Sequence, residues 1–280
     1  AAIILAGLSY QDKDGYLNTG LNLLKKIIKF SFNNDGFPKS RNPRQLNFYL
    51  KYFVLIREWL KESQNEIPEY INENVYYLGQ AYSFIWRYDK KDFLFNGNHE
   101  TNNTEFDQYL KRLGYSFKSQ SNELGGYAIL NNKKISLVMD IGSSPDKKFS
   151  SDYQAGSLSF EIMSGEKKLI CNSGYFQNFK HRLNELSKST AVHSTLTLDD
   201  NSPEQMKFIG YDKITSKNKI NNLKFDIRFH LEPNVKVMKT QDNKSILIDL
   251  DGEGWKFISA DNDINIDNGL YFGKENSFTN

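Results

Sequence analysis

The feature that most constrains the fold of this chain is a change in its hydrophobic period near residue 115. Before that point, apolar residues recur every three or four positions, as on one face of a helix. After it, short runs alternate with a period of two, as in half-buried strands. The sequence therefore predicts a helical part, 1–114, and a β part, 115–280, with the junction in the polar stretch NGNHETNNTEFDQYLKRLG.

Several segments of the first part carry the helical period. They are YLNTGLNLLKKIIKFSF, the run from Arg44 to Leu60, the run from Pro68 to about Trp86, and TEFDQYLKRL. Turn-forming residues in SFNNDGFPKSRNP separate the first two. The opening AAIILAGLSY is interpreted as a helix cut within the element, so we expect the chain to be a fragment of a longer protein.

The second part is predicted to form many short antiparallel strands. The runs YAIL, KISLVMDI, SLSFEIM, KKLICNS, STLTL, KFDIRFHL, VKVM, SILIDL and GWKFISA are rich in β-branched and aromatic residues, and turn-forming stretches separate them. Such spacing is typical of an antiparallel sandwich or barrel. There is no alternation of strands and helices, so a doubly wound nucleotide-binding sheet is not expected. The predicted class is α+β.

Composition narrows the possible functions. Lys and Arg number 36 against 34 Asp and Glu, so the net charge of +2 gives no large cationic field for nucleic acid or anionic lipid. Any anionic ligand must therefore be held by a local cluster. The single Cys171 excludes an intramolecular disulfide and is expected to be buried and inert. The opening run lacks a basic leader and is too short to span a membrane, so no membrane insertion is expected.

Two polar stretches of the helical part are candidates for a binding site. DGFPKSRNP places Arg41 and Asn42 in a loop between helices. A guanidinium can bind a carboxylate in bidentate fashion, and the amide adds a donor; a solvated loop is the alternative. FIWRYDKKDFLFNG places Arg87 and Tyr88 at a helix end, where Tyr88 is either functional or a structural aromatic residue.

In the β part, three polar residues stand at or near strand ends. His193 precedes the strand in KSTAVHSTLTLDD and is either a hydrogen-bonded structural residue or a catalytic one. His230 alternates with apolar residues in RFHLEP and faces either solvent or a cleft. Gln154 opens QAGSLSFEI. The GEG and GG pairs lack the context of a phosphate-binding loop and are interpreted as hairpin turns.

Taken in order, YQAGSLSFEI, KKLICNSG, LSKSTAVHSTLTLDD, RFHLEPNV and LDGEGWKF resemble the heparinase II/III-like family of polysaccharide lyases, particularly its alphaproteobacterial type. NNDGFPKSRNP and IWRYDKKDFLFNG occupy the places of that family's motifs in the helical half. The resemblance covers nearly the whole chain. It implies the C-terminal part of an (α/α) toroid followed by an antiparallel β-sandwich, an acidic polysaccharide as partner, and a location in the periplasm or cell envelope.

The resemblance also implies β-elimination at a uronic acid, in which the carboxylate is neutralised, a base removes the C5 proton and an acid protonates the departing O4. It assigns proton transfer to Tyr88 with His193 assisting, and substrate binding to Arg41, Asn42, Arg87, Gln154 and His230. The loop histidine of the family falls near Phe37 or Pro38, and neither of these can titrate.

Some members of the family hold a structural zinc at positions that map to Gln154, Asn172 and His193. Gln and Asn are weak zinc ligands, so we expect no tightly bound zinc and no other cofactor. The alternative to a lyase is a non-catalytic glycan-binding or cell-envelope protein that keeps the fold. A lyase requires the residues around Arg41, Tyr88 and His193 to converge on one cleft between the two parts, and burial of His193 in the β core would count against it.

Overall fold

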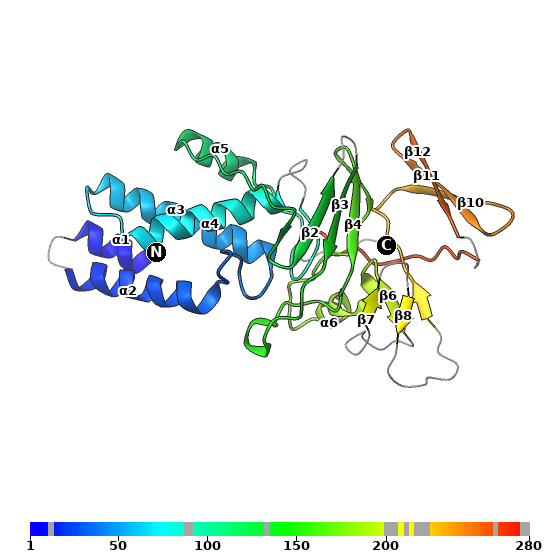
Figure 1. The fold of residues 1–280 in the computed structure, drawn as a ribbon, viewed down its shortest axis with the longest axis horizontal. Coiled ribbons are helices and arrows are strands. Elements are labelled where there is room, and N and C mark those ends of the chain that lie inside the picture. Colours follow the sequence, from blue (N-terminus) through cyan, green and yellow to red (C-terminus); the bar gives the residue numbers. More distant parts are fainter. Residues whose placement is uncertain are drawn as a thin grey trace.

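The computed structural model describes residues 1–10, 14–86, 92–131, 135–198, 207–209, 213–215, 225–259 and 263–274. Helices occupy the N-terminal part of the chain and antiparallel strands occupy most of the rest (Figure 1). The helices of the first part are α1 (Ala2–Ser9), α2 (Asp14–Ser31), α3 (Pro43–Glu62), α4 (Glu69–Ile85) and α5 (Thr104–Arg112). Helices α2 to α5 lie where the apolar period predicted them, and α1 lies in the opening run that was interpreted as a helix. None of the helices in the described ranges is both long and apolar enough to cross a membrane.

The start of α3 shows how the sequence fixes a helix boundary. Asn42 is the N-cap, and its side chain accepts hydrogen bonds from the backbone N–H groups of Arg44 and Gln45. Pro43 occupies the first turn, where its missing N–H is not needed. The helix then buries Leu46, Leu50, Phe53 and other apolar residues of the same face. The loop before α3 is thus held in a fixed position relative to the core.

A five-stranded antiparallel sheet follows the helices. Its strands are β1 (Glu123–Leu124), β2 (Tyr127–Asn131), β3 (Ile135–Asp140), β4 (Phe160–Ser164) and β5 (Lys167–Ile170), in that order across the sheet. Side chains alternate between its two faces. One face supplies Tyr127, Val138 and Met163 to the core that the helices build. The helical part and this sheet therefore share one hydrophobic core.

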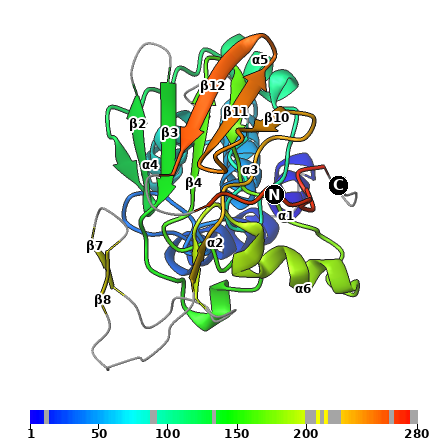
Figure 2. The ribbon, with the colours of Figure 1, turned by 90° about the vertical axis from the view of Figure 1, so that its right-hand side faces the viewer.

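The other face of the five-stranded sheet packs against a three-stranded sheet of β10 (Lys236–Lys239), β11 (Ser245–Leu250) and β12 (Glu253–Ile258). Leu169 of β5 and Ile248 of β11 lie in this second core. Figure 2 shows β11 and β12 in front of β3 and β4, with the helices behind. Two short pairs complete the β part: β6 (Leu196–Leu198) with β9 (Phe225–Ile227), and β7 (Lys207–Ile209) with β8 (Lys213–Thr215). Every ladder among the described strands is antiparallel, and Gly174 with Phe272 forms an isolated parallel bridge.

The β part also contains helical turns that the period-two pattern did not predict. They are α6 (Arg182–Lys188) and two 3-10 turns, η1 (Lys147–Phe149) and η2 (Thr190–Val192). Helix α6 is seven residues long, too short for an apolar period to show in its sequence. Its first turn is capped by the imidazole of His181, which accepts from the Leu183 N–H at 3.2 Å.

Candidate functional site at the junction of helices and sheet

Arg41 lies at the end of the loop before α3, and its side chain is buried with 7% exposed. Its guanidinium donates hydrogen bonds to the carbonyl oxygens of Gly126 at 2.8 Å and Ser143 at 3.1 Å, and it forms an ion pair with Asp140. Gly125 O accepts a further bond from Nε at 3.2 Å. The guanidinium is therefore enclosed by the sheet edge, and a substrate carboxylate would have to displace Asp140 to bind it in the same geometry.

Gly126 is needed for this contact. Its φ of +82° lies in the left-handed region, and a Cβ there would come within 2.7 Å of the Arg41 guanidinium. The GG pair of NELGGYAIL, interpreted from the sequence as a hairpin turn, does connect β1 to β2. It also leaves the space that admits the arginine from the helical part.

Asp140 connects Arg41 to a second loop. Besides the guanidinium, the carboxylate accepts from Asn96 Nδ2 at 3.0 Å and from Gly142 N at 3.2 Å. Burial raises the pKa of Asp140, and the neighbouring Arg41 opposes that rise. Tyr127 donates from its hydroxyl to the Arg41 carbonyl at 2.6 Å, and Asn96 Nδ2 lies 2.6 Å from the same hydroxyl. Three segments far apart in the sequence thus meet in one buried polar network.

Asn42 lies beside this network. Its Oδ1 caps α3, while its Nδ2 is 3.5 Å from Asp152 Oδ2. The hydroxyl of Tyr175 donates to the other oxygen of Asp152 at 3.1 Å. Gly97, with φ of +85°, lies between Asn42 and Asp152, and a Cβ there would come within 2.5 Å of Asn42 Nδ2. The Asn96-Gly97 turn is therefore packed directly against the loop before α3.

Gln154 is fully buried and uses its whole amide internally. Its Oε1 accepts from Gly97 N at 3.0 Å, and its Nε2 donates to Gly174 O at 3.0 Å and Ser187 O at 2.6 Å. These partners come from three separate loops. The geometry makes Gln154 a clamp that holds the loops together, and it leaves no amide N–H pointing to solvent for a substrate.

His193 is enclosed, with 1% of its surface exposed. Its Nδ1 is 2.9 Å from Ser189 O, which places the proton on Nδ1, and its Nε2 is buried without a hydrogen-bond partner. Burial lowers the pKa of His193 to about 4. Gly156 packs against the ring, because a Cβ there would lie 2.7 Å from Cδ2. This position counts against direct contact between His193 and a substrate.

His230 is also partly buried. Its Nε2 lies 3.0 Å from Ala191 O, and burial lowers the pKa of the imidazole. The backbone N–H of His230 bonds to the Ser194 hydroxyl at 3.1 Å, which ties it to the residue after His193. The sequence left open whether the His230 ring faces solvent or a cleft. In the structure it does neither, because the ring packs against the backbone of η2.

Arg87 and Tyr88 lie outside the described residues, so their convergence with Arg41 stays a prediction. The two residues that flank this segment are joined directly, because Trp86 Nε1 donates to Asp92 Oδ1 at 2.7 Å. Of the predicted site residues, the structure brings Asn42 and Gln154 together around Gly97.

The positions that would hold zinc do not fit a metal ion. The Gln154 amide is fully used, and Asn172 Oδ1 accepts from Ser194 N at 3.1 Å while its Nδ2 has no partner. His193 is the one imidazole of the three positions, and no thiolate or carboxylate of a described residue joins it. Among the residues with described positions, no group of three or more His, Cys, Asp and Glu side chains is arranged to hold a metal.

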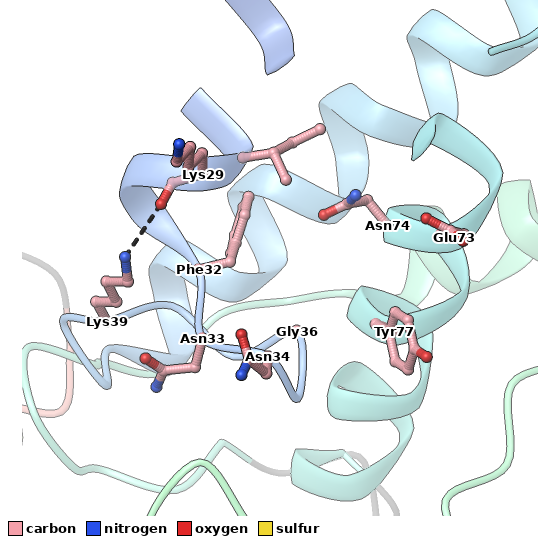
Figure 3. A pocket seen from close by; sticks show the side chains of 10 residues that line it. Lys29, Phe32, Asn33, Asn34, Gly36, Lys39, Glu73, Asn74 and Tyr77 are labelled. Carbon is pink, nitrogen blue, oxygen red and sulfur yellow. Dashed lines mark hydrogen bonds between the residues drawn. The ribbon is translucent and has the colours of Figure 1, made fainter. Parts of the chain in front are cut away.

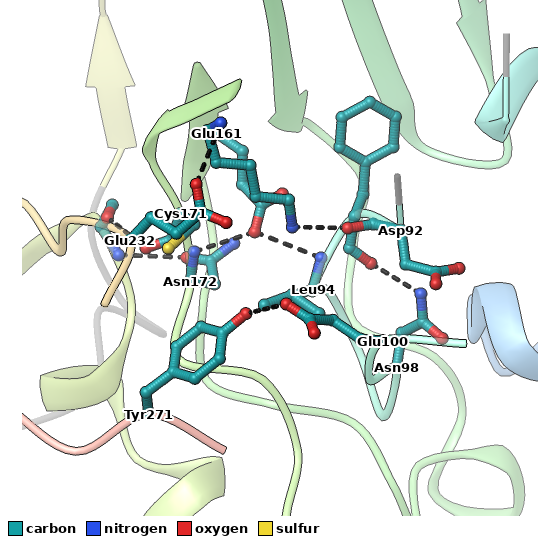
Figure 4. A network of polar contacts seen from close by, with 12 residues as sticks. Asp92, Leu94, Asn98, Glu100, Glu161, Cys171, Asn172, Glu232 and Tyr271 are labelled. Atoms are coloured by element: carbon teal, nitrogen blue, oxygen red, sulfur yellow. Dashed lines mark hydrogen bonds and ion pairs between the residues drawn. The ribbon is translucent and has the colours of Figure 1, made fainter. Parts of the chain in front are cut away.

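A second buried network, which sequence reasoning missed, supports the loop after residue 91 (Figure 4). Lys168 Nζ donates to Asp92 O at 2.5 Å and lies 3.3 Å from Glu161 Oε2. Glu161 Oε1 accepts from Leu94 N at 3.2 Å and Asn172 N at 2.8 Å. The sequence gives no signal for it, because Glu161 alternates with the apolar Phe160 and Ile162 and is therefore predicted to face solvent, whereas the structure buries it.

Two further residues matter for the chemistry of the site. Cys171 is buried, as the sequence predicted, and burial raises the pKa of its thiol, so it is a poor nucleophile.

Tyr153 is a phenol that sequence reasoning did not assign to the site. It interacts with Ser144 and Arg41 and is partly exposed. Burial and the nearby Asp140 raise the pKa of Tyr153, which keeps the phenol protonated.

Known structures share this fold. A heparan sulfate lyase mutant from Pedobacter heparinus superposes with a TM-score of 0.75 at 17% identity, covering 98% of this chain and 54% of that protein. A heparinase III superposes with a TM-score of 0.78 at 14% identity, covering 99% of this chain and 54% of that protein. The chain therefore spans about half the length of these proteins.

Comparison of the sequence with protein families identifies the family of this chain. No curated protein sequence matches this chain. The family model described as heparinase II/III-like, C-terminal, matches residues 117–207 and 202–280, which together make up more than half of the chain. The change of hydrophobic period, the shared core of helices and sheet, and this match agree, and the chain belongs to the heparinase II/III-like family.

Proposed function

We propose that this protein is part of a polysaccharide lyase that cleaves a uronate-containing acidic polysaccharide by β-elimination. The observation that carries the proposal is the family match over residues 117–280. The shared fold with a heparan sulfate lyase supports it. In this proposal, residues 1–114 form the C-terminal part of an (α/α) toroid and residues 115–280 form a β-sandwich. The proposed location is the periplasm or cell envelope, which cell fractionation can test.

The reaction needs three events at one uronate residue of the polymer. A base takes the C5 proton, the electron pair forms the C4–C5 double bond, and the C4–O4 bond breaks with a proton delivered to O4. Neutralising the carboxylate makes the C5 proton more acidic. We assign proton transfer to Tyr88 and the substrate carboxylate to Arg41 and Asn42, with Arg87 and His230 as further contacts. His193 and Gln154, which the sequence placed among the groups that act on the substrate, are assigned to support of the surrounding loops because both are buried.

The geometry refines these roles. Arg41 is paired with Asp140, so its action on a substrate carboxylate requires exchange of one carboxylate for another. His193 and Gln154 are buried and hydrogen-bonded, so they act by holding the loops that border the site. Tyr153 is a phenol beside Arg41 and is a second candidate for proton delivery to O4.

The burial of His193 and Gln154 favours a second candidate function, a non-catalytic glycan-binding protein. One assay separates the two. The full-length protein is incubated with a panel of uronate polymers, and ultraviolet absorbance is followed for the C4–C5 double bond. A lyase produces this absorbance, and the Tyr88→Phe variant abolishes it while polymer binding is kept. Tyr153→Phe is the matched variant for the second phenol. Polymer binding without unsaturated product would establish the glycan-binding alternative.

A further inference from the structure

We propose that a basic groove between α2, the loop before α3 and α4 binds the anionic groups of the polymer outside the reaction site. The inference rests on the proposed function for the identity of the polymer, a sulfated or carboxylated polysaccharide. The groove has two adjoining hollows, of about 540 Å³ and about 460 Å³. Lys29 lines both hollows, so they lie next to each other along α2.

The two walls of the larger hollow carry different chemistry (Figure 3). Lys29 and Lys39 lie on the wall formed by α2 and the loop, and Asn74 and Tyr77 lie on the α4 wall. Lys39 Nζ donates to Lys29 O at 3.1 Å, which holds the second ammonium group beside the end of α2. The smaller hollow adds Lys25 and Lys26 from the preceding turn of α2.

The charges of the groove are unbalanced. Lys25, Lys26 and Lys29 are exposed, Lys39 is partly exposed, and within the described part of the chain none of the four forms an ion pair. Glu73 is the one carboxylate among the residues that line the two hollows. Because the whole chain has a net charge of only +2, this concentration of cations is local. Such a patch attracts a polyanion.

The remaining groups fit a sugar chain. Tyr77 lines the larger hollow and is 45% exposed, so part of its ring is available to a sugar. Tyr76 packs edge to face against it, with 5.4 Å between the ring centres. Asn33 and Asn34 line the same hollow with exposed amides, which can both donate to and accept from hydroxyl groups. Ammonium, amide and open aromatic ring together match an acidic polysaccharide.

The groove is connected to the junction site by a single loop. Asn33, Asn34, Gly36 and Lys39 line the groove, and Arg41 follows two residues later in the buried network. Gly36 packs against Tyr77, because a Cβ there would lie 2.4 Å from the Tyr77 Cβ. The same loop therefore lines the groove and supplies Arg41 to the junction site.

The test compares two variants with equal charge change in the full-length protein. The groove variant carries Lys25→Gln, Lys26→Gln, Lys29→Gln and Lys39→Gln. The control variant carries Lys236→Gln, Lys239→Gln, Lys244→Gln and Lys256→Gln, which lie on and between β10 to β12, at the opposite end of the molecule from α2 (Figure 1). Binding of heparin is measured by titration calorimetry at several salt concentrations, and thermal melting confirms that both variants fold.

We expect the groove variant to bind heparin about tenfold more weakly or worse, because each exposed charge contact is worth a modest amount and four are removed. The slope of log affinity against log salt should fall by roughly 3, by analogy with the counterions released from nucleic acids. The control variant should retain the slope and affinity of the parent. Equal losses in both variants, or no loss in either, would overturn the inference.

Two further arms separate this inference from its rivals. Duplex DNA of matched charge is titrated in parallel, and tighter binding of DNA than of heparin would identify a nucleic-acid groove and overturn the proposal. A neutral polysaccharide should not bind with a salt-dependent affinity. The lyase proposal and the groove proposal can fail independently. If the parent protein yields no unsaturated product but the two variants still differ in heparin binding, the groove proposal holds and the lyase proposal fails. If product forms and the groove variant binds heparin like the parent, the groove fails alone.

Discussion

The junction site and the basic groove are both polar, yet they use their polar groups in opposite ways. At the junction, Arg41 and Asp140 are buried and paired with each other. In the groove, Lys25 and Lys29 are exposed and make no ion pair with any described residue. Buried ionic groups must be satisfied internally, whereas exposed cations keep their hydration and can exchange it for a ligand. We therefore expect the junction mainly to fix the loops and, as proposed above, the groove to meet the polymer.

The largest effect should come from removing one member of the buried ion pair. Arg41→Ala leaves the Asp140 carboxylate buried with its main partner lost, and we expect the free energy of unfolding to fall by about 3–5 kcal/mol. Urea denaturation measures this change. The matched control is Arg228→Ala, because Arg228 pairs with Asp226 at an exposed site, where a loss of at most about 1 kcal/mol is expected. Similar losses at the two sites would show that the junction pair is not a structural element.

Acid should destabilise the protein through His193. Because its folded pKa is lowered to about 4, below an ordinary value of about 6.5, the unfolded chain binds the proton first as pH falls. Stability from this group is complete above about pH 6.5 and declines towards pH 4, by up to about 3 kcal/mol. Urea titrations at pH 7 and pH 4.5 should therefore differ less for His193→Gln than for the parent. An unchanged difference in the variant would mean that another group controls the acid response.

The clamp formed by Gln154 should contribute less than the ion pair. Gln154→Ala removes one acceptor and two donors and leaves the buried Gly97 N–H and the Ser187 and Gly174 carbonyl oxygens without this partner. We expect a loss of about 1–3 kcal/mol in the free energy of unfolding. Gln80→Ala on α4 is the control, because no side-chain hydrogen bond ties that residue to another described segment. A loss at Gln154 as small as that at Gln80 would contradict the clamp.

The smallest effect on stability should come from the groove. Its four lysines form no ion pairs with described residues, so their joint replacement by Gln should change the free energy of unfolding by less than about 1 kcal/mol. Urea denaturation of the same variant used for heparin binding provides the value. A loss as large as that of Arg41→Ala would mean that these cations support the fold, and the contrast between the two regions would disappear.

The fold could be predicted from the sequence further than the site. The apolar periods located α2 to α5, and each of the nine predicted runs contains a strand, because period is a local property of the chain. The short strands β1, β7 and β8 lie outside those runs and were missed. Helix α6 was missed because a segment of seven residues is too short to show a helical period. The match to the heparinase II/III-like family confirmed the resemblance that the motifs had indicated.

The site depended on contacts that no local pattern records. Arg41 and Asp140 are 99 residues apart, so the motif that suggested a carboxylate-binding arginine did not reveal that a carboxylate of the same chain already occupies it. Gly126 in NELGGYAIL was interpreted as part of a turn. Its second role, leaving room for the Arg41 side chain, is visible only in the folded chain. The orientation of His193 was likewise decided by packing against Gly156. The groove lysines were visible in the sequence but not distinguishable there from an ordinary solvated helix face.

The most direct test of the proposed lyase follows cleavage of a uronate polymer by the full-length protein in heavy-oxygen water. Elimination forms the new product end without adding water, so the fragments should absorb in the ultraviolet and carry no heavy oxygen by mass spectrometry. Hydrolysis would place heavy oxygen in one fragment and give no absorbance. We expect unsaturated, unlabelled fragments that the Tyr88→Phe variant does not produce. Labelled fragments, or bound polymer that is never cleaved across the panel of uronate polymers, would contradict it.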